Sequence, residues 1–164
     1  MSKTSPYRSL SPERRLSIVT RAMTHRRELR AALIQRMVAR GGGFRAVTLQ
    51  SWPVEKLARE IVRMKAESPQ DELDLLHMLY VELEPAIQTT FLDAAGVRHE
   101  EAKIAEELEP PFADEAAVAR AAKVVEAQHG AEGRQYLDTI ALYNLASWPG
   151  LDRVLAEMDS ASDS

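Results

Sequence analysis

Residues 68–96, SPQDELDLLHMLYVELEPAIQTTFLDAAG, are the stretch on which the expected fold depends. Their apolar residues recur at alternating steps of three and four, which places side chains on one face of an α-helix: Leu73, Leu76, Tyr80, Leu83 and Ile87. Further apolar residues widen this face on both sides: Leu75, Leu79, Phe91 and Leu92. The pattern predicts a central helix around which the rest of the chain packs.

The ends of this helix and one defect inside it are also readable. The Ser68 hydroxyl can accept a hydrogen bond from a free backbone amide, and Pro69 suits the first helical position. Gly96 predicts a left-handed C-cap. Pro85 removes one backbone hydrogen bond, at a cost of about 3 kcal/mol in a straight helix. We therefore expect a kink near Pro85, or two helices that meet at Glu84.

Length and composition narrow the class of protein. A chain of 164 residues with 45% hydrophobic content is long enough for one domain with a core. The absence of cysteine excludes a disulfide scaffold, thiolate catalysis and Cys-ligated metal sites. Neither a signal-peptide-like apolar run nor a membrane-spanning stretch of about 18 apolar residues is present. We expect a soluble, cytoplasmic protein.

The remaining segments also have helical periodicity, and no alternating strand pattern accompanies them. The expected segments are a basic helix at 11–40, a glycine hinge at 41–43, an extended connector at 44–50, a helix at 51–67, an acidic helix at 99–108, an alanine-rich helix from Asp114 to Gly130, a helix at about 132–145 and a last helix from Ser147. The predicted fold is an all-α, single-domain bundle of six or seven helices. We expect residues 1–10 to be flexible and basic, residues 11–158 to form the helical domain with its core in 51–158, and residues 159–164 to be a disordered polar tail.

The pentapeptide pattern L-x-S-W-P occurs twice, at residues 49–53 and 145–149. A serine cap followed by tryptophan and proline suits the entry to a helix, so we expect both Trp52 and Trp148 to be buried. Duplication of a helical unit is the alternative explanation, but a single recurrence of five residues supports it weakly.

Charge is distributed very unevenly along the chain. Residues 1–45 contain eleven Lys or Arg against Glu13 and Glu28, a balance of +9, so the remainder carries −13 to reach the net charge of −4. This polarity indicates contact surfaces. The candidate basic surface consists of Arg14, Arg15, Arg21, Arg26, Arg27, Arg30, Arg36 and Arg40, and the candidate acidic surface of Glu100, Glu101, Glu106 and Glu107.

The basic helix is open to three interpretations. Its apolar stripe favours packing on the bundle, with the arginines against the acidic segment or in water: Val19, Met23, Leu29, Leu33 and Met37. Alternatively, eight arginines could bind phosphates of a nucleic acid, although the aromatic residues of single-strand binders are not interleaved with them. The helix could also swing out on its glycine hinge to contact another protein or a second copy of the chain.

Chemistry-bearing motifs are sparse. The spacing Glu126-x-x-His129, with a poorer match at Asp74 and His77, is that of di-metal helical bundles, in which Glu82 and Glu84 could supply further ligands. A histidine at a helix C-terminus needs no metal to explain it, so we expect no bound metal or cofactor. No nucleophile elbow, phosphate-binding loop or HExxH motif is present.

These observations favour a non-enzymatic helical protein-interaction or scaffolding module that uses the basic helix and the acidic segment as contact surfaces. The expected partner is another protein or a second copy of the chain. A nucleic-acid-binding accessory protein is the main alternative, and a metal-dependent helical-bundle enzyme is the third.

Overall fold

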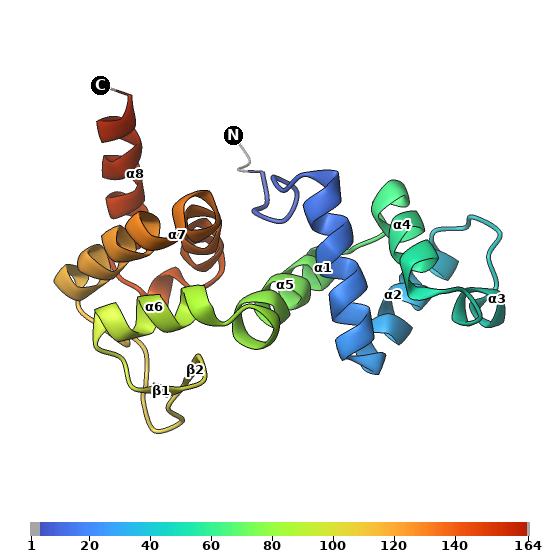
Figure 1. Ribbon diagram of the computed structural model, residues 1–164, viewed down its shortest axis with the longest axis horizontal. Helices are drawn as coiled ribbons and strands as arrows, with labels where there is room; N and C mark the ends of the chain where they lie inside the picture. Colours follow the sequence, from blue (N-terminus) through green and yellow to red (C-terminus); the bar gives the residue numbers. More distant parts are fainter. Residues whose placement is uncertain (1–3, 164) are drawn as a thin grey trace. The chain divides into compact units, whose positions relative to one another are not determined.

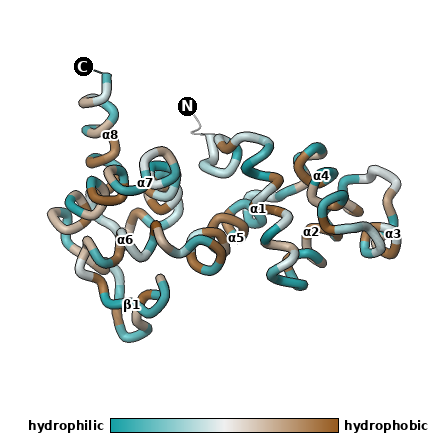
Figure 2. Tube along the Cα trace, in the orientation of Figure 1, coloured by the Kyte–Doolittle hydropathy of each residue, from teal (hydrophilic) through white to brown (hydrophobic). Residues whose placement is uncertain are grey.

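The computed structural model describes residues 4–163, and within them it is all-α, as the sequence predicts (Figure 1). The helices are α1 (Pro12–His25), α2 (Arg27–Ala39), α3 (Ala46–Gln50), α4 (Val54–Met64), α5 (Pro69–Met78), α6 (Ala86–Ala95), α7 (Glu115–Tyr143) and α8 (Leu151–Ser162). A π-helical turn η1 (Leu79–Leu83), a 3-10 turn η2 (Leu145–Ser147) and two short strands, β1 (His99–Glu100) and β2 (Lys103–Ile104), lie between them. Along the helices of Figure 2, hydrophobic and hydrophilic positions alternate, as expected of helices with one buried face.

The chain forms two compact units, Met1–Leu79 and Tyr80–Ser164, where the sequence analysis expects a single domain. The boundary falls inside the apolar stripe of residues 68–96, so this stretch is not one central helix. Leu75 and Leu76 are buried in the first unit, whereas Ile87 and Phe91 are buried in the second. One continuous apolar pattern therefore supplies two cores.

The segment around Pro85 explains this division. Helix α5 continues into the π-helical turn η1, Glu84 and Pro85 lie outside any helix, and α6 begins at Ala86. The predicted interruption near Pro85 is thus confirmed, as a complete break in the helix. Proline cannot donate to the preceding turn, so regular helical hydrogen bonding stops there.

Both predicted caps of this stretch are confirmed. The backbone amide of Asp71 donates to Ser68 Oγ at 3.1 Å, and the Ser68 amide donates to Asp71 Oδ2 at 2.8 Å, a reciprocal capping box. Gly96 ends α6 with φ of 73°, a left-handed conformation that glycine adopts without steric cost.

In the first unit, α1 packs against α2, α4 and α5. The sequence predicts one helix over residues 11–40, but the chain breaks at Arg26, which has an extended backbone with φ −133° and ψ 116°. Arg26 lies in the middle of the apolar stripe, where a straight helix would turn its charge toward the core. The break leaves Arg26 exposed while Met23 and Leu29 on either side are buried.

The connector between α2 and α4 also differs from the prediction. Residues 46–50 form the short helix α3, with Leu49 buried, where an extended connector over 44–50 is predicted. Ser51 does not cap α4, because its hydroxyl donates to the Thr48 carbonyl at 2.7 Å and α4 begins after Pro53. Trp52, expected to be buried, is half-buried.

In the second unit, α7 packs against α6 and α8 around a cluster of aromatic rings. The Phe91 ring meets the Trp148 ring edge-on at 4.8 Å between centroids, and the Tyr136 ring meets those of Tyr80 and Phe91 at 5.1 and 5.8 Å. Trp148 is 3% exposed, which confirms its predicted burial. Edge-to-face pairs of this kind add to the stabilisation that burial gives.

Helix α7 is two helices joined at Gly130, which has φ 58° and ψ −132°. This agrees with the prediction that one helix ends at Gly130 and another begins near Glu132. Gly133 lets the two segments approach closely, since a Cβ there would lie 2.7 Å from the Val125 carbonyl oxygen.

Two predictions for the second unit are wrong. The segment expected to be an acidic helix at 99–108 forms a β-hairpin, in which His99 pairs with Ile104 and Glu100 with Lys103. The segment has too few apolar residues to hold a helix on the core, and its neighbouring glutamates repel one another. The tail predicted to be disordered over 159–164 is helical through Ser162, and residue 164 lies outside the described residues. Helix α8 also begins later than the predicted Ser147, at Leu151.

Candidate interaction site

The boundary between the two units is also a boundary in charge. The first unit contains fifteen Lys or Arg against eight Asp or Glu, a formal charge of +7. The second contains six against seventeen, a formal charge of −11. The asymmetry seen along the sequence therefore coincides with the division into two compact units.

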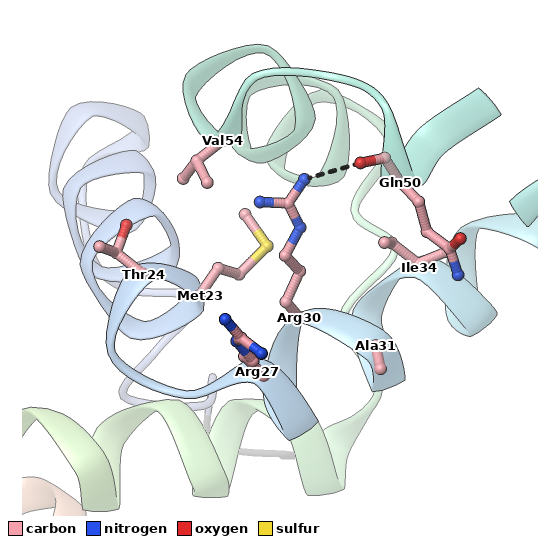
Figure 3. Close-up of a pocket in the computed structure, with 8 residues that line it drawn as sticks. All are labelled: Met23, Thr24, Arg27, Arg30, Ala31, Ile34, Gln50 and Val54. Atoms are coloured by element: carbon pink, nitrogen blue, oxygen red, sulfur yellow. Dashed lines mark hydrogen bonds between the residues drawn. The ribbon is translucent and has the colours of Figure 1, made fainter. Parts of the chain in front are cut away.

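A pocket of about 480 Å³ opens in the basic unit at the elbow between α1 and α2 (Figure 3). Its lining residues come from the four helices α1, α2, α3 and α4: Met23, Thr24, Arg27, Arg30, Ala31, Ile34, Gln50 and Val54. Met23 and Ile34 are each 2% exposed and form an apolar floor, whereas Thr24, Arg27 and Ala31 are exposed at the rim. The volume lies within the range of small-ligand and side-chain pockets.

The Arg30 side chain crosses this pocket and is held in place. Its Nη2 donates to the carbonyl oxygens of Gln50 at 3.3 Å and Trp52 at 2.9 Å, and Figure 3 shows the guanidinium pointing toward Val54 and Gln50. Both hydrogen bonds are donated by Nη2, so the N–H groups of Nη1 and Nε remain available to donate to a ligand. Arg30 thus links α2 to the α3–α4 connector and still presents donors.

The connector that receives Arg30 is itself fixed by aromatic contacts. The rings of Phe44 and Trp52 meet edge-on at 5.3 Å between centroids, and Lys56 Nζ lies 4.2 Å from the centroid of the Trp52 ring. This ammonium covers one face of the indole. The connector to which Arg30 is bonded is therefore held by packed side chains.

Arg27 lies at the α1–α2 elbow on the rim of the pocket and is exposed. Within residues 4–163 its guanidinium makes no hydrogen bond, ion pair or ring contact. Arg27 is thus a cation beside an apolar floor, available to an external carboxylate.

The other predicted arginines are distributed differently. Arg36 Nε is 3.2 Å from Asp71 Oδ2, and Arg40 donates to the Lys65 carbonyl, so these two hold α2 to other parts of the same unit. Arg14, Arg15 and Arg21 are half-buried on α1, and Arg26 is exposed at the break. Of the eight arginines proposed as one surface, the pocket brings together Arg27 and Arg30.

The acidic candidates lie on and beside the hairpin of the second unit. Glu100 and Glu101 are exposed at its turn, where Glu101 has φ of 48°, and Glu106 and Glu107 are exposed just after β2. Glu107 forms an ion pair with Arg98. The hairpin therefore displays these carboxylates on one short segment.

A buried polar cluster near the N-terminus was missed by the sequence analysis. Residues 1–10 were expected to be flexible, but Tyr7 is fully buried and its hydroxyl donates to Glu67. Arg8 Nε is 3.1 Å from Glu72 Oε1, and Ser5 Oγ donates to the same oxygen at 2.9 Å. Burial, reinforced by the Glu67 carboxylate, raises the pKa of Tyr7. The partners are about 60 positions away in the chain, so no local pattern predicts this cluster.

The metal-ligand spacings do not lead to a ligand cluster. Among residues 4–163, no three His, Asp or Glu side chains converge closely enough to hold a metal ion. His77 is exposed on α5, and His129 Nε2 is 2.9 Å from Thr90 Oγ1. Glu82, Glu84 and Glu126 are half-buried.

In the part of the chain that the structure describes, no helix combines the length and apolar character needed to cross a lipid bilayer. Comparison with profiles of known protein families, with curated proteins and with solved structures gives no match.

Proposed function

We propose that the protein is a non-enzymatic helical interaction module whose basic unit binds an acidic surface of a partner protein. The observation that carries this proposal is the pocket at the α1–α2 elbow, where the exposed Arg27 guanidinium lies beside the buried side chains of Met23 and Ile34. Apolar area combined with a cation lacking a partner is typical of a recognition site.

The acidic hairpin is the second contact surface of this proposal. Glu100, Glu101 and Glu106 are exposed close together, in a unit of formal charge −11, and would attract a basic partner. One basic and one acidic binding surface on the same chain suit a scaffolding role, in which two partners of opposite charge are held together.

A nucleic-acid partner is the alternative, and the +7 charge of the first unit favours it. Two features weigh against it. Arg30, Arg36 and Arg40 already donate to acceptors of the protein. The Trp52 ring is in contact with Phe44 and Lys56, which limits its use as a stacking platform for bases.

The test is fluorescence anisotropy of the full chain with labelled poly-L-glutamate and with labelled single- and double-stranded oligonucleotides, at low and at physiological salt. We expect poly-L-glutamate to bind at low salt and to bind more weakly to the Arg27→Glu variant. Arg59→Glu makes the same charge change at an exposed position of α4 outside the pocket. This variant should bind poly-L-glutamate more tightly than Arg27→Glu does.

Physiological salt should abolish oligonucleotide binding, because contacts to phosphates weaken steeply as counterions are added. Salt-resistant, submicromolar binding to DNA or RNA would replace the proposal with the nucleic-acid alternative. Elution volume measured at the same salt concentrations reports whether a second copy is the partner.

A further inference from the structure

We infer that the pocket at the α1–α2 elbow recognises an aliphatic side chain with a carboxylate next to it, on an acidic segment of a partner protein. This inference rests on the proposed function and specifies the chemistry of the partner. The proposed function requires only that the partner is acidic. The inference also requires an aliphatic side chain in the pocket and a carboxylate that pairs with Arg27.

The floor of the pocket points to the aliphatic part of the ligand. Met23 and Ile34 are almost completely buried, and Val54 is half-buried on the facing side. In Figure 3 the side chains of Met23, Arg30 and Val54 point toward one another in the middle of the pocket. The apolar lining atoms that are still exposed, on half-buried Val54 and the stem of Arg30, gain free energy when an apolar side chain displaces water from them.

The donors at the rim point to the charged part of the ligand. Arg27 has no partner within the described residues, and Arg30 keeps the N–H groups of Nη1 and Nε after its two bonds to the connector carbonyls. The eight lining residues include no Asp or Glu, so no carboxylate of the pocket competes for these donors. Charge complementarity therefore favours a carboxylate on the ligand, held by Arg27 at the rim.

A rigid wall makes this recognition selective for shape. Arg30 is tied to the Gln50 and Trp52 carbonyls, and Trp52 is in contact with Phe44 and Lys56. A pocket formed in advance does not lose the entropy of ordering its own side chains when the ligand binds. The preference for an aliphatic side chain should therefore exceed that of a flexible basic surface.

The experiment compares two acetylated, fluorescent 12-residue peptides of equal charge with the full chain: one that alternates leucine with glutamate and one that alternates alanine with glutamate. The leucine peptide should bind at least about tenfold more tightly, the scale of a few buried methylene groups. The Ala31→Phe variant narrows the pocket at its exposed rim and should reduce this preference to about twofold or less. Ala39→Phe introduces the same ring at an exposed position of α2 outside the pocket and should leave the preference for the leucine peptide unchanged.

Arg27→Gln should weaken both peptides by about threefold to tenfold, as expected for the loss of one charged pair at a partly desolvated site. Arg59→Gln is its matched control. Far-UV circular dichroism and the melting temperature of each variant establish that it is folded.

Each other outcome has a definite meaning. Equal binding of the two peptides, or a leucine preference that survives in Ala31→Phe, overturns the inference and leaves the proposed function standing. Failure of both peptides and of poly-L-glutamate to bind the wild-type chain at low salt overturns the proposed function, and the inference with it.

Discussion

Tyr7 ties the N-terminal residues to the first unit through one buried hydroxyl. Its ring is fully buried, and its hydroxyl donates to Glu67, a residue that is itself 3% exposed. Removing the hydroxyl would leave a buried carboxylate with one donor fewer, a change that costs about 1 to 3 kcal/mol. Tyr7→Phe should lower the free energy of unfolding by this amount at pH 7, measured by urea denaturation.

The same residue predicts how stability depends on pH. Burial raises the pKa of Tyr7 above its ordinary value of 10.0, so the folded state holds the phenolic proton more tightly than the unfolded chain does. The stabilisation is complete below pH 10 and is lost as pH rises further, by about 1.4 kcal/mol per pH unit. Urea denaturation of the first unit between pH 8 and pH 11 should show this loss, and Tyr7→Phe should remove it.

Tyr136 provides the matched comparison in the second unit, since burial raises its pKa as well. Tyr136→Phe should make the second unit less sensitive to alkaline pH and leave the first unit unchanged. An alkaline loss of stability in the first unit that persists in Tyr7→Phe would show that another group is responsible.

The two tryptophans occupy the same sequence motif but different environments. Trp148 is 3% exposed against the Phe91 ring, so Trp148→Ala should cost about 3 to 5 kcal/mol. Trp52 is half-buried, and Trp52→Ala should cost roughly half as much. Denaturant titration of both variants checks this order, and equal losses would contradict it.

At the scale of helices, predictions succeeded where the determining contacts are local. The Ser68 and Asp71 capping box, the left-handed Gly96 and the break near Pro85 each depend on residues within a few positions of one another. Ser51 has the same local sequence features but does not cap α4, because its hydroxyl donates to the Thr48 carbonyl at the end of α3. The rule identifies a serine able to cap, and a competing carbonyl three residues earlier decides the outcome at Ser51.

The candidate site was predictable only as a set of charges. The sequence shows eight arginines on one segment, but not that Arg30 would bond to the carbonyls of the α3–α4 connector while Arg27 remains at the rim. That distinction requires the break at Arg26 and the packing of α2 beside α3. The Arg30 bonds join positions 20 and 22 residues apart, which is beyond the reach of a helical pattern.

Helix α7 carries a prediction of its own, because its two halves depend on glycine. A Cβ at Gly133 would lie 2.7 Å from the Val125 carbonyl oxygen and 2.9 Å from Val125 Cγ1, and both distances require backbone movement. Gly133→Ala should therefore destabilise the second unit by about 1 to 3 kcal/mol. Glu132→Ala, a neighbouring exposed position, should change stability by less than about 0.5 kcal/mol. Thermal unfolding of both variants measures the difference, and a neutral Gly133→Ala would contradict the close approach.

At the scale of the whole molecule, the two compact units have opposite formal charges, +7 and −11. The binding of charged ligands to either unit should therefore be sensitive to salt. Apolar contacts, in contrast, hold each unit together. Surface ion pairs contribute only about 0 to 1 kcal/mol each, whereas full burial of one large aliphatic side chain contributes about 1.5 to 3 kcal/mol. Salt should therefore change binding far more than it changes the free energy of unfolding.

Deletion of residues 1–40 tests whether α1 and α2 belong to the fold or only serve a partner. These helices contribute buried side chains to the first unit: Ile18, Val19, Ala22, Met23, Leu29, Leu33, Ile34 and Met37. Helix α1 packs on α4 and α5, whose buried faces would lose this cover. The deletion should expose apolar surface, lower the melting temperature and promote aggregation, as measured by thermal unfolding and light scattering.

Deletion of residues 160–164 is the control, because residues 160–163 are exposed and the deletion removes no residue of the apolar core. It should leave the melting temperature and the elution volume unchanged. A monomeric, equally stable chain after deletion of residues 1–40 would mean that the eight buried side chains of α1 and α2 add nothing to the fold. Their burial at about 1.5 to 3 kcal/mol for each large side chain makes that outcome incompatible with the packing of the first unit. The arginines on α1 and α2 are thus held in position by the apolar core beneath these helices.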